Sequence, residues 1–147
     1  MDIGWVLVGF INWKVTIFVD LPAIMNIFLI EDDAIYSEFI QKGLRQNAEY
    51  KVKPFASAED ALQVINGKLP DIIIVDYKLP GLSGIELYEK IKPRITDTNK
   101  VIMLSAIDDG NMVLSFIQKG VRDYVIKDEN VITSLQAIIS GEEENYF

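Results

Sequence analysis

The 147-residue sequence contains no cysteine and no histidine. Without cysteine, the chain has no disulfide framework, no thiolate chemistry and no cysteine-ligated zinc. Without histidine, it lacks the commonest general base and the commonest metal ligand, and it cannot itself carry a phosphohistidine. If phosphate reaches this protein from a histidine, that histidine therefore belongs to a partner.

Basic residues are scarce as well. The chain has 14 Lys and Arg against 22 Asp and Glu, which gives a formal net charge of -8. No stretch resembles a basic face, and this argues against direct binding of nucleic acid. P-loop chemistry is excluded because the sequence has no G-x-x-x-x-G-K-[ST]; the tripeptide Asn66-Gly67-Lys68 is not that motif. With 50% hydrophobic and 24% charged residues, the composition is typical of one packed globular domain.

The first 24 residues are apolar but do not form a membrane span. Asn12, Lys14 and Asp20 interrupt them, so no apolar run approaches the ~20 residues that a spanning helix needs. Met25 stands directly before the first clear strand. We predict that residues 1–24 are an extension outside the domain, which then runs over residues 25–147. The alternative is an additional strand or hairpin packed on that domain.

From Met25 onward, a short apolar run and a helical pattern alternate five times. This alternation predicts an α/β fold, in which a parallel sheet carries helices on both faces and right-handed crossovers join the strands. The first helical segment places Ile35, Phe39, Ile40 and Leu44 on one side. The predicted strands are Asn26–Ile30, Tyr50–Phe55, Ile72–Val75, Lys100–Leu104 and Tyr124–Ile126, the second of them at a sheet edge because lysines interrupt it.

Polar side chains follow these strands where each one ends. Asp76 comes directly after Ile72–Val75, and Ser83 with Glu86 then forms a capping box that opens a helix. Glu31, Asp32 and Asp33 follow the first strand, Ser105 the fourth and Lys127 the fifth. Asp33 alone is best interpreted as a helix N-cap.

The carboxyl ends of parallel strands meet at one edge of the sheet. In the flavodoxin-like strand order 2-1-3-4-5, strands one and three are neighbours, so Glu31, Asp32 and Asp76 should converge. Three adjacent carboxylates repel one another, and a divalent cation relieves that repulsion. Hard oxygen ligands in this number suit Mg²⁺, which often binds together with a phosphate. Lys127 adds a mobile cation, and Ser105 adds a hydroxyl group.

An acidic pair, a single Asp, a Ser and a Lys at successive strand ends form a pattern that resembles the response-regulator receiver domain, in its stand-alone, chemotaxis-regulator-like form. The matches are IEDD at Ile30–Asp33, VDYKLPGLSG at Val75–Gly84, LSA at Leu104–Ala106 and DYVIK at Asp123–Lys127. The four motifs occur in the family's order and at matching positions. The resemblance implies a flavodoxin-like, doubly wound, five-stranded sheet over the whole of residues 25–147.

The resemblance also implies roles for individual residues. Asp76 would be the phosphoacceptor. Asp32 and Asp76 would bind Mg²⁺ directly, with Glu31 assisting through water and the backbone carbonyl of Lys78 as a further ligand. Ser105 would hydrogen-bond the phosphoryl group, Lys127 would pair with it, and Tyr124 would be a switch aromatic that turns inward after phosphorylation.

As a biological function, the resemblance implies a cytoplasmic two-component signalling module that catalyses at most its own phosphorylation and dephosphorylation. A histidine kinase or a histidine phosphotransfer protein would supply the phosphate. A downstream protein, or a second copy of the chain, would bind the last two helices and the fifth strand, with no direct contact to nucleic acid or membrane.

Three positions make this chain distinctive. Lys127 is followed by Asp128, where many members of the family have Pro. Lys78 and Ile107 lie two positions after Asp76 and Ser105, and by resemblance they flank the path of the hydrolytic water. We expect this long cation and this bulky apolar side chain to slow dephosphorylation.

Two other functions compete with this one. A pseudo-receiver would serve only as an interaction or dimerisation module, but the complete set of acids, Ser and Lys argues against it. A Mg²⁺-dependent phosphohydrolase would need a second acid just after the nucleophile, where this chain has Lys78.

Overall fold

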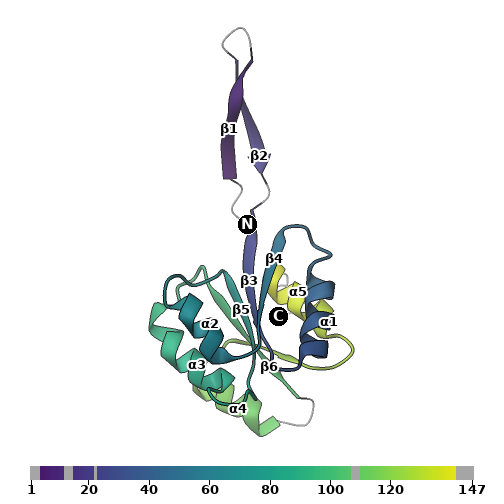
Figure 1. Cartoon of the computed structure of the whole chain (residues 1–147), viewed down its shortest axis with the longest axis vertical. Helices are drawn as coiled ribbons and strands as arrows, with labels where there is room; N and C mark the ends of the chain where they lie inside the picture. Colours follow the sequence, from purple (N-terminus) through teal and green to yellow (C-terminus); the bar gives the residue numbers. More distant parts are fainter. Residues whose placement is uncertain (1–3, 12–14, 22, 107–109, 142–147) are drawn as a thin grey trace.

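Five parallel strands form the central sheet of the computed structural model, which describes residues 4–11, 15–21, 23–106 and 110–141 (Figure 1). Their order in the sheet is β4-β3-β5-β6-β7. Counted from Met25, this is the order 2-1-3-4-5, so the predicted flavodoxin-like fold is confirmed. The strands are β3 (Met25–Ile30), β4 (Tyr50–Phe55), β5 (Ile72–Asp76), β6 (Lys100–Ser105) and β7 (Asp123–Ile126).

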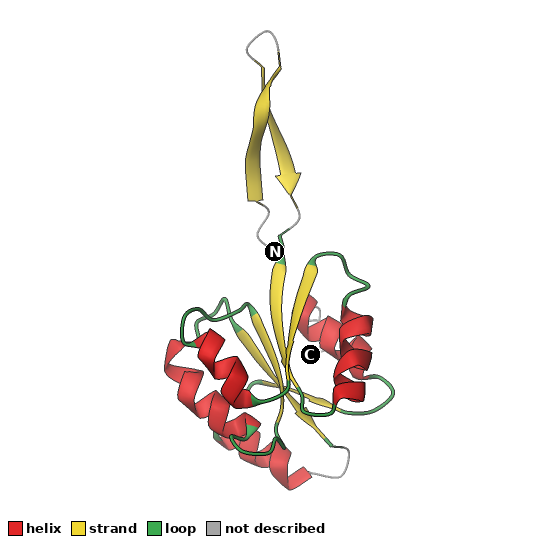
Figure 2. Cartoon of the chain, viewed as in Figure 1, coloured by secondary structure: helices red, strands yellow, loops and turns green. Residues whose placement is uncertain are grey.

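The helices cover both faces of this sheet, with α2, α3 and α4 on one side and α1 and α5 on the other (Figures 1 and 2). Each face has its own apolar core, and β5 contributes to both because all five of its residues are buried. The unbroken apolar run of β5 therefore fills two cores at once. The helices are α1 (Ala34–Leu44), α2 (Ala58–Ile65), α3 (Gly84–Ile91), α4 (Gly110–Gln118) and α5 (Val131–Ser140), and the short 3₁₀ helix η1 (Lys92–Arg94) follows α3.

Side-chain caps fix where the helices that flank the strand ends begin. The Asp33 carboxylate accepts hydrogen bonds from the backbone N–H groups of Ile35 and Tyr36, so its predicted role as an N-cap is confirmed. Ser83 and Glu86 form the predicted reciprocal capping box at the start of α3. These caps hold the helix starts next to the acids at the carboxyl ends of β3 and β5.

The buried face predicted for the first helix, α1, is right for two of its four residues and wrong for the other two. Ile40 and Leu44 of α1 are fully buried, whereas Ile35 and Phe39 are 84% and 51% exposed. The inward face runs through Ser37, Ile40 and Leu44, whose spacing of three and four residues keeps them on one side of the helix. Phe39 precedes Ile40 by one residue, which turns it about 100° away from that face.

The N-terminal residues form a hairpin with a sheet of its own. Strand β1 (Gly4–Ile11) pairs antiparallel with β2 (Val15–Leu21), and the register shifts between Leu7 and Gly9. Figure 1 shows this hairpin projecting beyond the end of the sheet at which β3 begins. The domain boundary at Met25 stays a prediction. Within the described residues, no helix is long and apolar enough to cross a membrane.

Candidate functional site

Three carboxylates converge at the carboxyl edge of the sheet. The parallel register sets Ile30 of β3 opposite Val75 of β5, so Glu31 and Asp76 leave adjacent strands at the same level. One carboxylate oxygen from each of Glu31, Asp32 and Asp76 lies within 4.8 Å of the others. Glu31 and Asp76 are only 2% and 6% exposed, whereas Asp32 is open to solvent. The convergence predicted from strand order is present.

Lys127 bridges the two buried carboxylates. Its Nζ lies 2.8 Å from Glu31 Oε2 and 2.8 Å from Asp76 Oδ2. The backbone N–H of Lys127 also donates to the carbonyl of Ser105 at 2.8 Å, which ties the end of β7 to the end of β6. The cation predicted from the last strand end is therefore held directly against Asp76.

Burial and charge act in opposite directions on this cluster. Burial raises the pKa of Glu31, although Lys127 opposes that rise. Burial also lowers the pKa of Lys127, but its hydrogen bonds and charge interactions with Asp76 and Glu31 outweigh burial, so the pKa of Lys127 is raised. The site thus favours the protonated form of Lys127.

The loop after β5 orients the Asp76 carboxylate. Asp76 Oδ1 accepts a hydrogen bond from the backbone N–H of Lys78 at 3.0 Å, while Oδ2 faces Lys127. Gly84 N–H donates to the Tyr77 carbonyl at 3.1 Å, and a Cβ added at Gly84 would lie 2.8 Å from Tyr77 Cα. Glycine therefore lets the start of α3 pack directly against the backbone of Asp76 and Tyr77.

A second element secures the same loop. The exposed Glu59 carboxylate of α2 accepts a hydrogen bond from the backbone N–H of Leu82 at 2.6 Å, and this bond lowers the pKa of Glu59. The loop between β5 and α3 is thus held from inside by Asp76 and from outside by α2. Sequence reasoning missed both Gly84 and Glu59, although glycine in the first turn of a helix is a signal for close backbone approach.

The remaining predicted residues lie around this centre. Ser105 is fully buried at the end of β6, and its hydroxyl donates to the Ala106 carbonyl at 3.2 Å. Tyr124 of β7 is 39% exposed. The Lys78 side chain is exposed, and Ile107 lies outside the described residues. Asp128 organises the loop after β7, because its carboxylate accepts the Asn130 N–H at 2.8 Å.

The donor set at this edge suits a hard divalent cation. Three carboxylates face one ammonium group, and among the described residues no hydrogen bond or ion pair occupies the carboxylate of Asp32. Carboxylate oxygens, together with waters, are the ligands that Mg²⁺ prefers. The residues present therefore fit a divalent cation such as Mg²⁺, and Asp32 is the carboxylate of the three that is open to solvent.

The comparison with known families agrees with this geometry. The sequence profile of the response regulator receiver domain matches residues 27–139. The chain belongs to the response regulator receiver domain family. The matched range begins in β3 and ends in α5, so the five-stranded sheet and its helices make up the receiver domain.

Individual relatives of this receiver domain include transcriptional regulators and chemotaxis proteins. It is 34% identical over 102 residues to the transcriptional regulatory protein AfsQ1 of Streptomyces coelicolor, which covers 69% of this chain and 44% of AfsQ1. It is 30% identical over 113 residues to the chemotaxis protein CheY of Listeria monocytogenes, which covers 75% of this chain and 92% of CheY. The chain thus spans under half of AfsQ1 but nearly the whole of CheY.

Solved structures of receiver domains superpose on the same part of the chain. A response regulator from Chloroflexus aurantiacus J-10-fl matches with a TM-score of 0.70 and 30% identity, over 80% of this chain and 98% of that one. The BeF3-activated DrrB receiver domain matches with a TM-score of 0.69 and 28% identity, over 83% of this chain and 99% of that one.

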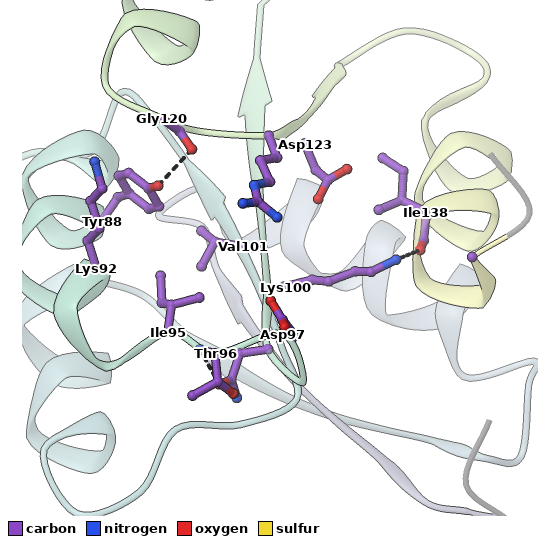
Figure 3. Close-up of a pocket in the computed structure, with 13 residues that line it drawn as sticks. Tyr88, Lys92, Ile95, Thr96, Asp97, Lys100, Val101, Gly120, Asp123 and Ile138 are labelled. Carbon is purple, nitrogen blue, oxygen red and sulfur yellow. Dashed lines mark hydrogen bonds between the residues drawn. The ribbon is translucent and has the colours of Figure 1, made fainter. Parts of the chain in front are cut away.

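A cavity of about 590 Å³ lies at the opposite edge of the sheet, between the starts of β6 and β7 and the ends of α3 and α5 (Figure 3). Lys100 donates to the Ile138 carbonyl at 2.8 Å, and the Tyr88 hydroxyl donates to the Gly120 carbonyl at 2.9 Å. Burial raises the pKa of Asp123 in its wall, against the influence of Lys100. None of the residues predicted for the phosphoacceptor site lines this cavity.

Proposed function

We propose that this receiver domain is a phosphoacceptor module of a two-component phosphorelay, with Asp76 as the phosphorylated residue. The observation that carries the proposal is the setting of the Asp76 carboxylate. One oxygen is fixed by the Lys78 N–H and the other by Lys127, within reach of two further carboxylates. Glu31 has similar contacts, since its Oε1 accepts the Asp33 N–H at 3.2 Å and its Oε2 pairs with Lys127, but its side chain is only 1% exposed against 9% for Asp76. The choice of Asp76 therefore also draws on its place in the VDYKLPGLSG motif that resembles the family's phosphoacceptor segment.

The proposed reaction is nucleophilic attack by an Asp76 carboxylate oxygen on phosphorus. A new P–O bond forms, while the bond from phosphorus to the donor's imidazole nitrogen, or to the acyl oxygen of acetyl phosphate, breaks and its electrons leave with the donor. A carboxylate can serve as such a nucleophile. Phosphoryl transfer depends mainly on alignment and on stabilisation of charge, and Lys127 is placed to supply one positive charge.

Glu31, Asp32 and Asp76 would hold Mg²⁺, with the Lys78 carbonyl as a further ligand. When bound, the ion would neutralise charge on the transferring phosphoryl group. The protein's own residues would do the rest: the Lys78 N–H would orient Asp76, and Lys127 would exchange carboxylate oxygens for phosphoryl oxygens.

Phosphorylation would then alter a surface on α4, β7 and α5. The new phosphoryl oxygens would attract the hydroxyl of Ser105, and Tyr124 on the neighbouring strand would turn inward. Exposed apolar side chains on this side support its use in binding, because Leu114, Ile117 and Tyr124 are 59%, 56% and 39% exposed. A downstream protein or a second copy of the chain would dock there.

The donor would be a histidine kinase or a histidine phosphotransfer protein, since this chain contains no histidine of its own. The resulting lifetime of the phosphate is a separate part of the proposal. Replacing Lys78 and Ile107 together with small polar residues should shorten that lifetime, and an unchanged lifetime would refute a role for them in slowing hydrolysis.

Incubation with Mg²⁺ and acetyl phosphate, followed by intact-mass measurement, tests the proposal. The wild-type chain should gain the mass of one phosphoryl group, and Asp76→Asn should not. Asp97→Asn is the matched control, since Asp97 is exposed and lies by the cavity at the opposite edge of the sheet. Absence of any mass gain in the wild type would contradict the proposal and favour a pseudo-receiver.

A further inference from the structure

The aromatic ring of Tyr36 is an unassigned neighbour of the phosphoacceptor site. Tyr36 lies in the first turn of α1, and the Nζ of Lys127 sits over its ring, 4.6 Å from the centroid. An ammonium group within about 6 Å of a ring centroid is attracted by the negative face of the ring. The Lys127 ammonium therefore contacts an aromatic face in addition to the Glu31 and Asp76 carboxylates.

The hydroxyl of Tyr36 does not explain why the ring lies there. It is buried and has no hydrogen-bond partner, and among the described residues it is the only buried side-chain polar atom in that condition. Burial raises the pKa of this hydroxyl, and the charges of Lys127, Glu31 and Asp76 all act on it. The side chain thus reaches into the charged cluster without being held by a hydrogen bond.

Packing holds the ring instead. Tyr36 rests against the apolar core under α1 and α5, and its ring contacts that of Phe39 at a centroid distance of 6.0 Å. A ring fixed by the core restricts where the flexible four-carbon stem of Lys127 can place its ammonium group. The Lys127 side chain accordingly remains only 22% exposed although it lies at the rim of the sheet.

We propose that Tyr36 is a positioning residue for Lys127, and that its ring keeps the ammonium group beside Asp76. This inference rests on the proposed phosphoacceptor function. The ring, and not the hydroxyl, performs the task. Phe at position 36 should therefore preserve it, whereas Leu should lose it, because Leu fills space but has no aromatic face.

The rate of phosphorylation by acetyl phosphate in saturating Mg²⁺ gives the first readout. We expect Tyr36→Leu to slow the reaction about five- to tenfold, and Tyr36→Phe to remain within about twofold of the wild type. Tyr88→Leu is the matched control, because Lys92 lies 5.9 Å from the Tyr88 ring at the opposite edge of the sheet. Equal slowing by Tyr36→Leu and Tyr88→Leu, or slowing by Tyr36→Phe as large as that by Tyr36→Leu, would overturn the inference.

A double-mutant cycle gives a second readout that does not depend on phosphorylation. Unfolding by urea in EDTA is measured for Tyr36→Leu, Lys127→Met and the double variant. We expect the two changes to be non-additive by about a factor of five to ten in the unfolding equilibrium constant; additive effects would overturn the inference. A wild type that takes no phosphate would refute the proposed function, while the cycle would still decide whether Tyr36 holds Lys127.

Discussion

Replacing Lys127 with Met should destabilise the protein through the charges that it leaves behind. Met keeps much of the length of the side chain but removes the ammonium group that lies 2.8 Å from both Glu31 and Asp76. The Glu31 and Asp76 side chains are only 1% and 9% exposed. Water can therefore do little to compensate either carboxylate once its partner is gone.

The magnitude follows from the burial of this group. Breaking a buried ion pair by removing one partner costs about 3–5 kcal/mol. Because the Lys127 side chain is 22% exposed, we expect the lower end of that range, about 3 kcal/mol. For a urea m-value of about 1–3 kcal/mol/M, the unfolding midpoint would fall by about 1–3 M.

The pH dependence separates charge from packing. Burial already raises the pKa of Glu31, and Lys127 opposes that rise, so the pKa of Glu31 should be higher still in Lys127→Met. An acid with a raised pKa in the folded state binds its proton more tightly there than in the unfolded chain. The stability of the variant should therefore increase as the pH falls. The difference from wild type should shrink between pH 7.5 and pH 5.

Urea unfolding in EDTA at these two pH values is the assay. Lys119→Met is the matched control, because the Lys119–Glu89 pair has the same 2.8 Å separation but side chains that are 40% and 49% exposed. Loss of such an exposed pair should cost about 1 kcal/mol or less. Equal midpoints for Lys127→Met and the wild type, or a deficit that does not change with pH, would refute the reasoning.

Three further predictions concern the frame around the site and the far edge of the sheet. Gly84→Ala should destabilise the protein by about 1–3 kcal/mol, because the new methyl group meets the backbone of Asp76 and Tyr77. Gly110→Ala, with nothing within 4 Å of its Cβ, should not be destabilising in the same urea titration. Ser83→Ala should cost about 1 kcal/mol through loss of the α3 cap, and a stability equal to wild type would contradict this. Burial raises the pKa of Asp123, so the folded state holds this proton more tightly and the residue's contribution to stability falls as pH rises through that pKa. The free energy of unfolding of Asp123→Asn should therefore rise relative to that of the wild type between pH 4 and pH 7. Parallel pH–stability curves for the two proteins would exclude this effect.

The fold was predictable because β5 combines two constraints in five residues. A run of apolar residues without alternation must be covered on both faces, and an acid at its end must reach the sheet edge. Predicting the buried face of α1 from the same sequence was less successful. Ile35 and Phe39 fit an apolar periodicity as well as Ile40 does, but the packing of α1 against β4 and α5 selects which residues turn inward.

The site was predictable to the extent that strand order places residues. Glu31, Asp32, Asp76 and Lys127 each lie at the end of a strand or just after it, so topology alone brings them to one edge. The contacts of Tyr36 and Glu59 depend instead on how helices pack and on side-chain rotamers, which local patterns do not encode.

Lys78 shows a different limit of prediction from the sequence. Its side chain drew attention in the sequence, whereas in the structure its backbone N–H makes the contact with Asp76. A backbone group carries no residue-specific signal, so the orientation of Asp76 could be recognised only in three dimensions.

The central claim is that Asp76 carries the phosphate. It is tested most directly by treating the phosphorylated chain with borohydride, which reduces an acyl phosphate to an alcohol, and then mapping the reduced residue by peptide mass spectrometry. We predict reduction at Asp76 alone, because its carboxylate is oriented by the Lys78 N–H, paired with Lys127 and less deeply buried than that of Glu31. Reduction at Asp32 or Glu31, with Asp76 unchanged, would contradict the account.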